Sequence, residues 1–240
     1  MRSVIIDSRM SDKCKRRLEA LGFYLLELPA CPLLPEAIKS HPDTLICRIG
    51  DELVTTADYC DSAAHIFSDL RDHHPNIKVS FTSDTLGASY PNDCALNALS
   101  LGRDLYVKRD SASAALLERA ENLGYNIIPV KQGYVACTTL AGDGSYKFAV
   151  TADAGTARVL SANGVKVTVI SQGSISLPPY EYGFIGGACG VFRDKIYFAG
   201  DIATHPDGEA IISAASDAGF ECIMLSDEPL SDVGGMIFIE

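Results

Sequence analysis

The chain has 240 residues, of which 47% are hydrophobic and 21% charged, and its net charge is −11 at neutral pH. This composition is typical of a globular protein with a full hydrophobic core, and the negative charge argues against nucleic acid or an anionic membrane as a partner. The apolar run at the start is too short for a signal peptide and no segment reaches transmembrane length, so we expect a cytoplasmic protein.

The cysteine pattern gives no sign of a metal or redox site. No two of the eight cysteines are spaced as C-x-x-C, which removes the usual zinc and thiol–disulfide signatures. Without a secretory signal, a disulfide framework is not expected either. We therefore expect most of these side chains to be small buried apolar groups, and we expect no metal and no cofactor.

The chain opens with a strand at Ser3–Ile6 that has no partner nearby in the sequence. Ser11 can cap a helix that runs to Leu21 and stops at Gly22, where a left-handed residue is wanted. The first repeat then continues through three strands, at 23–28, 43–49 and 52–56, with a proline-containing connection after the first of them.

The same order of helix, glycine stop and three strands recurs along the chain. The helix at 111–123 places Leu116, Ala120 and Leu123 on one face, and Gly124 ends it. In the second repeat His73–Asn76 stands where the others have glycine, so Asn76 is expected to take the left-handed position. The second strand of the later repeats is expected at 93–99, after 133, at 184–191 and at 235–239.

The fifth repeat lacks a third strand, whereas the N-terminal strand has no partner. One arrangement explains both facts: the N-terminal strand completes the fifth repeat and closes a ring of five repeats of about 48 residues each. We predict a single α/β domain, a five-bladed pseudo-symmetric propeller, with repeats at 8–57, 58–109, 110–152, 153–200 and 201–240 plus strand 1–7. The alternative is one doubly wound parallel sheet. Such a sheet has about one strand per helix, whereas several strands follow each helix in this sequence.

Five such repeats resemble the pentein fold, the five-bladed α/β propeller of the guanidine-group-modifying enzymes and of a ribosome-binding initiation factor. Within the chain, Tyr90–Cys94, Gly183–Gly190 and Gly200–Ile202 resemble a clostridial-type family of unknown function assigned to this fold. The resemblance implies a site in which a cysteine thiolate attacks a guanidinium carbon, a histidine moves protons, and carboxylates hold the cation.

The residues that this resemblance asks for are not all present. The nucleophile's place in the last repeat reads Asp232–Ile237, with glycines but no cysteine. The letters His-x-Asp occur at His41–Asp43 and His205–Asp207, in segments that look like turns or helix starts. The sequence therefore predicts that the standard catalytic residues are missing.

Other residues could still carry chemistry near the axis. The candidate catalytic residues are Cys189, which follows two glycines, with Asp93 and His205 as partners. Candidate ligand-binding residues are Asp43, Asn97, Cys137 and Asp232. The alternative is that these small residues, including Cys94, only pack around a crowded five-fold axis.

The glycine run at 183–190 also invites comparison with a dinucleotide-binding loop. Such a loop leads from a strand into a helix, so that phosphate meets the helix N-terminus. Here Val191–Phe198 follows, which has the pattern of a hairpin. A nucleotide site is therefore not predicted.

The leading functional hypothesis is a ligand- or protein-binding module that lacks guanidine chemistry. Its pocket would lie at the mouth of the axis, among the loops that join the first and second strands, and a ligand would be cationic because Asp43, Asp93 and Asp232 end those loops. The alternative is a thiol-dependent hydrolase or amidinotransferase-like enzyme acting on a guanidino or related cation. The sequence does not determine the substrate, the partner or the oligomeric state.

Overall fold

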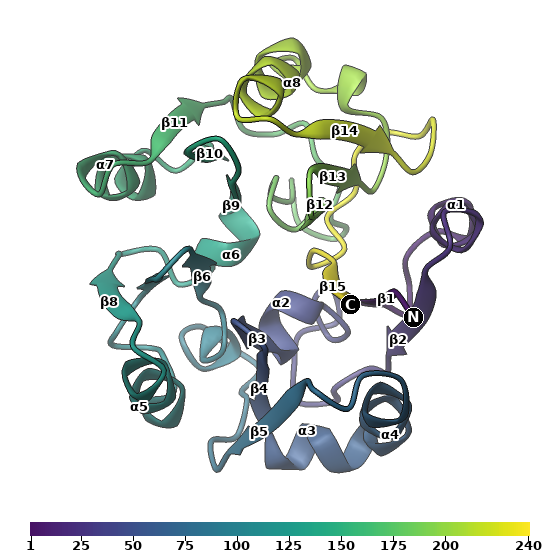
Figure 1. Cartoon of the computed structure of the whole chain (residues 1–240), viewed down its shortest axis with the longest axis vertical. Coiled ribbons are helices and arrows are strands. Elements are labelled where there is room, and N and C mark those ends of the chain that lie inside the picture. The colour runs from purple at the N-terminus through teal and green to yellow at the C-terminus, as the bar shows by residue number, and fades with distance from the viewer.

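The computed structural model describes all residues, 1–240, and builds them into five separate three-stranded sheets. The sheets lie side by side around a common centre (Figure 1). This excludes the alternative of one doubly wound sheet. In order from the inner to the outer strand, the sheets are β15 (Ile237–Ile239), β1 (Ser3–Asp7), β2 (Tyr24–Leu28); β3 (Cys47–Ile49), β4 (Glu52–Thr56), β5 (Lys78–Thr82); β6 (Leu99–Leu101), β7 (Asp104–Val107), β8 (Asn126–Pro129); β9 (Thr139–Asp143), β10 (Lys147–Thr151), β11 (Lys166–Val169); and β12 (Cys189–Phe192), β13 (Lys195–Phe198), β14 (Glu221–Met224).

Every sheet has the same pairing. The inner strand runs antiparallel to the middle strand, through a tight hairpin in four of the sheets, and the outer strand runs parallel to the middle strand after a helical crossover. Because the outer strand of each sheet comes after the next helix, the folded repeat is shifted by one strand relative to the predicted ranges. The N-terminal strand β1 pairs antiparallel with β15, with Val4 opposite Phe238, so the two ends of the chain share one sheet as predicted.

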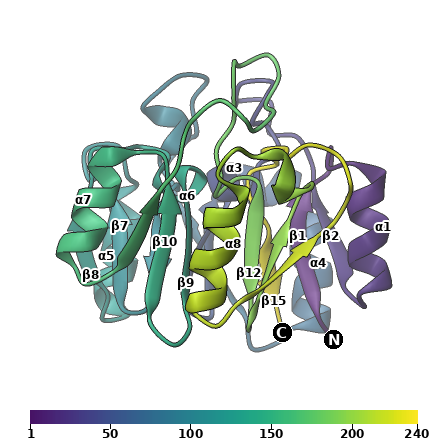
Figure 2. The ribbon, with the colours of Figure 1, turned by 90° about the horizontal axis from the view of Figure 1, so that it is seen from above.

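The helices cover the outside of the sheets (Figure 2). They are α1 (Asp12–Ala20), α3 (Ala57–Ser62), α4 (Ala64–His73), α5 (Ala114–Asn122), α7 (Ala154–Ala162) and α8 (Gly208–Asp217). The Ser11 hydroxyl accepts a hydrogen bond from Cys14 N and so caps α1, as predicted. None of the helices combines the length and the apolar character that crossing a membrane requires.

The predicted glycine stops are confirmed. A glycine follows the helix in four repeats, and its φ lies between 77° and 90° at Gly22, Gly124, Gly164 and Gly219. This backbone conformation is unfavourable for any residue that has a Cβ atom. The prediction for the second repeat is wrong, because Asn76 does not have a positive φ. There the helix is divided into α3 and α4, and α4 ends at His73 ahead of Pro75.

The core lies between each sheet and its helices. All five residues of β1 and all five of β4 are buried, since these middle strands have a strand on each side and are covered on both faces. Leu116 and Ala120 of α5 are buried, as the sequence predicted, and Ile211 and Ala215 of α8 are buried at the same spacing.

The segments just before the inner strands differ from the prediction. The expected strands at 43–49, 93–99 and 184–191 begin only at Cys47, Leu99 and Cys189. The chain forms compact turns ahead of these strands: α2 (Pro42–Leu45) before β3, the 3₁₀ turn η1 (Asn92–Cys94) before β6 and a turn at 185–188 before β12, while α6 (Val135–Thr138) precedes β9 in the same way. Pro42 opens α2 at a position where its missing N–H costs no helical hydrogen bond. These turns, and not strands, bring the polar residues to the centre.

Candidate functional site

A circuit of hydrogen bonds joins the five turns at the centre of the molecule. Asn97 Nδ2 donates to the Asp43 carbonyl (3.0 Å), and Asn97 Oδ1 accepts from Ala136 N (2.8 Å). Gly187 N then donates to the Cys137 carbonyl, Gly187 O accepts from the amides of residues 233 and 235, and Asp43 N donates to the residue 234 carbonyl. Each of the five sheets is thus tied to both of its neighbours at the axis.

Two buried carboxyl groups lie within this circuit. Burial, with the nearby Asp232 carboxylate as a smaller cause, raises the pKa of Asp43 to about 7. Both carboxyl oxygens of Asp43 are buried and accept no hydrogen bond from a nitrogen or oxygen donor, although the neighbouring Cys137 thiol, a weak donor, acts to lower the pKa of Asp43. Burial also raises the pKa of Asp232 to about 6, although the amides of Gly234 (3.0 Å) and Phe184 (2.9 Å) donate to its oxygens and oppose that shift. The pair forms an acidic centre without a cationic partner.

The Cys137 thiol lies beside these acids, on α6. Asn97 Nδ2 donates to Cys137 Sγ at 3.1 Å. Burial raises the pKa of Cys137 well above that of a free thiol, and the negative charges of Asp43 and Asp232 add to the shift. In the ligand-free protein this group is therefore a thiol and not a thiolate at neutral pH.

The imidazole of His41, at the start of α2, is buried between two carboxylates. Its Nδ1 lies 3.8 Å from Asp232 Oδ1 and its Nε2 lies 3.7 Å from Asp7 Oδ2. Burial lowers the pKa of His41 to about 4, against the attraction of Asp7. Arg9 neutralises Asp7 through two hydrogen bonds, at 3.0 and 2.6 Å. His41 is therefore neutral at physiological pH and can accept or donate one proton.

A cavity of about 360 Å³ opens onto these groups. Cys137, His41 and Asp232 form its floor, and aromatic or apolar side chains form most of its walls. The wall residues are Ile38, Tyr134, Leu177, Tyr180, Glu181, Tyr182 and Phe184. The loop from 172 to 182, predicted to border the mouth, supplies four of them and rises at the end of the molecule opposite the two termini (Figure 2).

Glycines make room for the two polar side chains. A methyl group on Gly187 or Gly183 would overlap Asp232, and one on Gly234 would overlap the His41 side chain. Gly234 also has a φ of 69°, which disfavours any other residue. The glycine runs of the fourth and fifth repeats therefore serve close packing around Asp232 and His41.

The structure brings together only some of the residues selected from the sequence. Asp43, Asn97, Cys137 and Asp232, the candidate ligand-binding residues, meet at the centre. The candidate catalytic residues do not meet. Cys189 borders a different cavity of about 230 Å³, and burial raises its thiol pKa. Asp93 lies beside Tyr134, whose pKa it raises together with burial. Their catalytic role stays a prediction.

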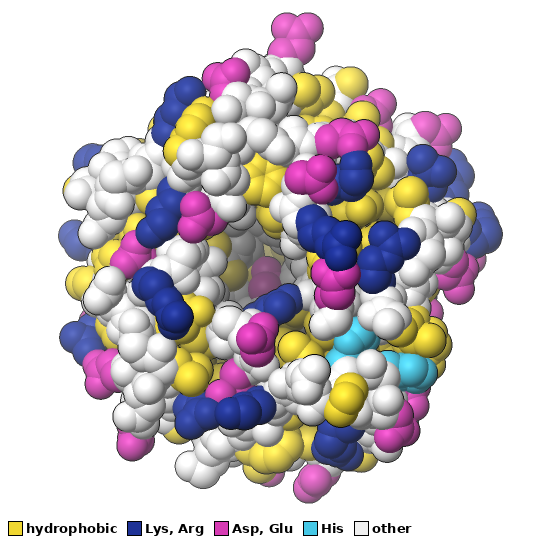
Figure 3. Space-filling view, viewed as in Figure 1, with side chains coloured by type: hydrophobic (Ala, Val, Ile, Leu, Met, Phe, Trp, Pro, Cys, Tyr) yellow, Lys and Arg dark blue, Asp and Glu magenta, His cyan; other side chains and the backbone are white.

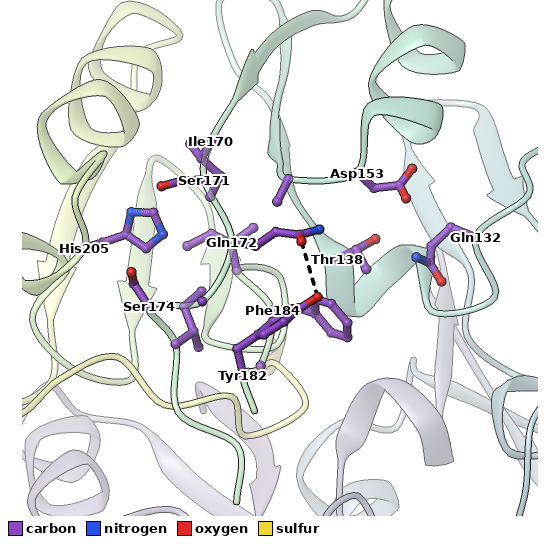
Figure 4. A pocket seen from close by; sticks show the side chains of 15 residues that line it. Gln132, Thr138, Asp153, Ile170, Ser171, Gln172, Ser174, Tyr182, Phe184 and His205 are labelled. Carbon is purple, nitrogen blue, oxygen red and sulfur yellow. Dashed lines mark hydrogen bonds between the residues drawn. The ribbon is translucent and has the colours of Figure 1, made fainter. Parts of the chain in front are cut away.

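His205 lies in a third place, a small cavity of about 40 Å³ (Figure 4). The Asp207 amide donates to His205 Nδ1 at 3.0 Å, and Tyr182 donates to Gln172 across the same cavity. Burial lowers the pKa of His205, with Asp207 opposing the shift. The local contacts fix His205 at the turn before α8, away from the acidic centre.

Sequence reasoning did not select His41, Asp7 or the tyrosines of the cavity. The His-x-Asp letters at residues 41–43 were a usable signal, since the turn that they form is what points both side chains inward. Asp7 ends a buried strand, and a carboxylate in such a place calls for a partner. Nothing in the letters indicates that Tyr134 and Tyr180 share a cavity. No group of three or more His, Cys, Asp or Glu side chains is placed to hold a metal ion.

A family model, described as a family of unknown function (DUF6873), matches residues 5–237. The chain belongs to this family. The sequence has no match among the curated proteins. Among solved structures, this DUF6873 member is similar in fold to several proteins, including two amidinotransferases and a DDAH, which agrees with the fold that the sequence resembles.

The first is an inosamine-phosphate amidinotransferase from Streptomyces griseus, with a TM-score of 0.57, 11% identity, and coverage of 97% of this chain and 90% of that one. The second is DDAH from Pseudomonas aeruginosa in complex with citrulline, with a TM-score of 0.57, 9% identity, and coverage of 94% and 92%. The third is an amidinotransferase of saxitoxin biosynthesis from Microseira wollei, with a TM-score of 0.56, 13% identity, and coverage of 94% and 78%. At these identities the likeness establishes the fold alone.

Proposed function

We propose that this protein binds a small cation of the guanidinium or amidinium type at its acidic centre. The observation that carries the proposal is the pair of buried carboxyl groups, Asp43 and Asp232, that lacks a cationic partner while a cavity opens onto Asp232. Burying a carboxylate without a partner is strongly unfavourable, so proteins keep such groups where a ligand supplies the countercharge.

The walls of the cavity suit a planar, weakly hydrated cation. Tyr134, Tyr180 and Phe184 present aromatic faces or edges, and Glu181 adds a carboxylate toward the mouth. Cations bind over aromatic rings with favourable energy, most of all where water is excluded. A guanidinium also matches a carboxylate such as Asp232 through two parallel N–H donors.

We also propose that the whole chain forms one domain, a five-bladed α/β propeller whose ring is closed by β1. The pairing of β1 with β15 and the circuit of hydrogen bonds through Asn97 and Gly187 support it. The acidic centre then lies on the axis, where all five repeats contribute to it.

The cation proposal is tested by calorimetric titration with methylguanidinium chloride, with methylurea as a neutral control of similar shape. We expect methylguanidinium to bind and methylurea not to bind. Asp232→Asn removes the carboxylate on the cavity wall and should weaken binding by about tenfold or more. Asp43→Asn should weaken it less, since this group acts from behind the thiol. Asp72→Asn, an exposed change on α4, is the matched control. Equal binding of the two probes would contradict the proposal.

A second candidate function, thiol-dependent attack on the bound cation, is favoured by one observation: Cys137, His41 and Asp232 line the same cavity. A cation bound there would offset the carboxylate charges that raise the thiol pKa, and so would increase the thiolate fraction. In the step proposed, neutral His41 accepts the thiol proton while Cys137 Sγ forms a bond to the amidine carbon. The C–N bond to the leaving amine breaks, the amine takes that proton from His41, and water or an amine then displaces Cys137 Sγ and releases the product.

This candidate predicts an unusual order of reactivity toward two electrophiles. Chloroacetamidine is a cation and chloroacetamide is its neutral counterpart. We expect Cys137 to be alkylated faster by chloroacetamidine, because the acidic centre attracts this cation and the bound cation then lowers the thiol pKa. Peptide mass spectrometry would give the rate at each of the eight cysteines, with Cys137→Ser as the control. Faster reaction of Cys137 with the neutral reagent would remove the thiol function and leave the binding function in place.

A further inference from the structure

A second opening lies on the opposite face of the molecule, at the end that carries the two termini. Figure 3 shows a hollow at the centre of this face. Two adjoining cavities, of about 370 and 230 Å³, share Arg48, Ser100 and Ile237 in their walls. Neither of them shares a lining residue with the cavity of the candidate site, although Asp43 of the acidic centre lines the larger of the two.

The inner strands of the five sheets build the walls of this opening. They contribute Arg48 from β3, Ser100 from β6, Ala141 from β9, Gly190 from β12 and Ile237 from β15. In β3 the neighbours of Arg48 point the other way, since Cys47 and Ile49 are buried in the hydrophobic core. Four of the five strands therefore present a neutral side chain to the axis, and β3 presents an arginine.

The guanidinium of Arg48 is half-buried and makes no salt bridge. Its Nε donates to the Gly50 carbonyl at 2.9 Å and its Nη1 donates to the Phe238 carbonyl. Its Nη2 has no protein partner among the hydrogen bonds. Burial lowers the pKa of Arg48, with Asp51 as a weak opposing influence, yet the group stays charged at physiological pH. Arg48 is thus a half-buried cation without a charged partner. Such a group attracts an anion locally, although the net charge of the protein is −11.

We propose that this opening is a binding site for a small monocarboxylate, held by Arg48. The remaining donors of the guanidinium fork would bind the carboxylate, and the Ser100 hydroxyl lies in the same wall. Ile46, Ala98, Ala136 and Ile237 give the cavity apolar walls that suit a short apolar body, and its remaining lining residues are Asp43, Cys47, Gly50 and Tyr125. A dianion fits less well, because one guanidinium would face two charges near Asp43 and Asp51.

A structural role alone would also explain part of the geometry, since Arg48 joins β3 to the C-terminal strand through Phe238. The two roles differ in what they predict for an added anion. A structural arginine binds no carboxylate in a saturable manner, whereas a ligand site does. The probe should therefore be a carboxylate of suitable size, and the readout should report where it binds.

The experiment is a titration of the full chain with sodium butyrate at constant ionic strength, followed by backbone-amide NMR. We expect saturable shifts at Gly50, Ser100 and Ile237 and none at Phe184 or Gly234, which flank the other cavity. Arg48→Met should weaken binding by about tenfold or more, and Arg193→Gln, an exposed arginine away from the opening, should leave it unchanged.

Three results would overturn the proposal. They are shifts that do not saturate, shifts that centre on Phe184 and Gly234, and unchanged binding to the Arg48→Met variant. If that variant fails to fold, the map of shifts on the unaltered protein still decides the question. Because butyrate carries no positive charge, its failure to bind is distinct from a failure of the cation proposal.

Discussion

Replacing Asn97 with alanine is expected to lower the free energy of unfolding by about 2–6 kcal/mol. The side chain of Asn97 is buried and holds three sheets together: it donates to the Asp43 carbonyl, accepts from Ala136 N and contacts Cys137 Sγ. Alanine would leave a half-buried carbonyl and a half-buried amide without these partners, at about 1–3 kcal/mol for each group.

The measurement is urea unfolding of the variant beside the unaltered protein. The matched control is Asn126→Ala on β8, where an exposed side chain donates to Asp104 at 3.0 Å. Such an exposed contact contributes about 0–1 kcal/mol. Similar midpoints for the two variants would show that the circuit at the axis is not what holds the five sheets together.

The repeat could be predicted because its signals are local. Each helix ends at a glycine whose positive φ is needed whatever the tertiary structure, as at Gly22 and Gly219. The closing pair of strands could be predicted because the N-terminal strand has no partner nearby and the fifth repeat lacks a strand. The structure does pair β1 with β15. The prediction of helix ends fails where a repeat diverges from the others. In the second repeat the helix divides into α3 and α4 and has no glycine after it.

The site could be predicted only in part, because its geometry depends on turns that the sequence does not specify. Asp43 and Asp232 were selected since charged residues at loop ends near an axis must converge. The letters around His41 indicate a turn and not a central strand, so the sequence does not place His41 at the centre. In the structure that turn points the His41 side chain inward. Cys189 and Cys137 occupy similar places in the sequence, yet they face opposite ends of the axis.

The acidic centre also predicts that the ligand-free protein loses stability as the pH rises from about 4 to about 7. The pKa of Asp43 is raised to about 7 in the folded state, so over this range the folded chain holds a proton that the unfolded chain has released. Asp232, with a pKa of about 6, acts in the same direction up to that pH. His41, with its pKa lowered to about 4, acts in the opposite direction, so two carboxyl groups outweigh one imidazole.

Asp43→Asn isolates the largest of these contributions. The variant keeps the shape of the side chain and cannot ionise, so it should be more stable than the unaltered protein at about pH 8, by on the order of 2–4 kcal/mol. The gain should shrink as the pH falls and disappear below about pH 4, where Asp43 is protonated in both the folded and the unfolded chain. Urea unfolding at several pH values measures this gain in stability, with the exposed Asp72→Asn change as the control.

A gain that does not depend on pH would show that Asp43 is not buried as a destabilising charge. A gain with the expected profile, together with weakened methylguanidinium binding, would show that the fold retains an unfavourable carboxylate in the place where its ligand binds.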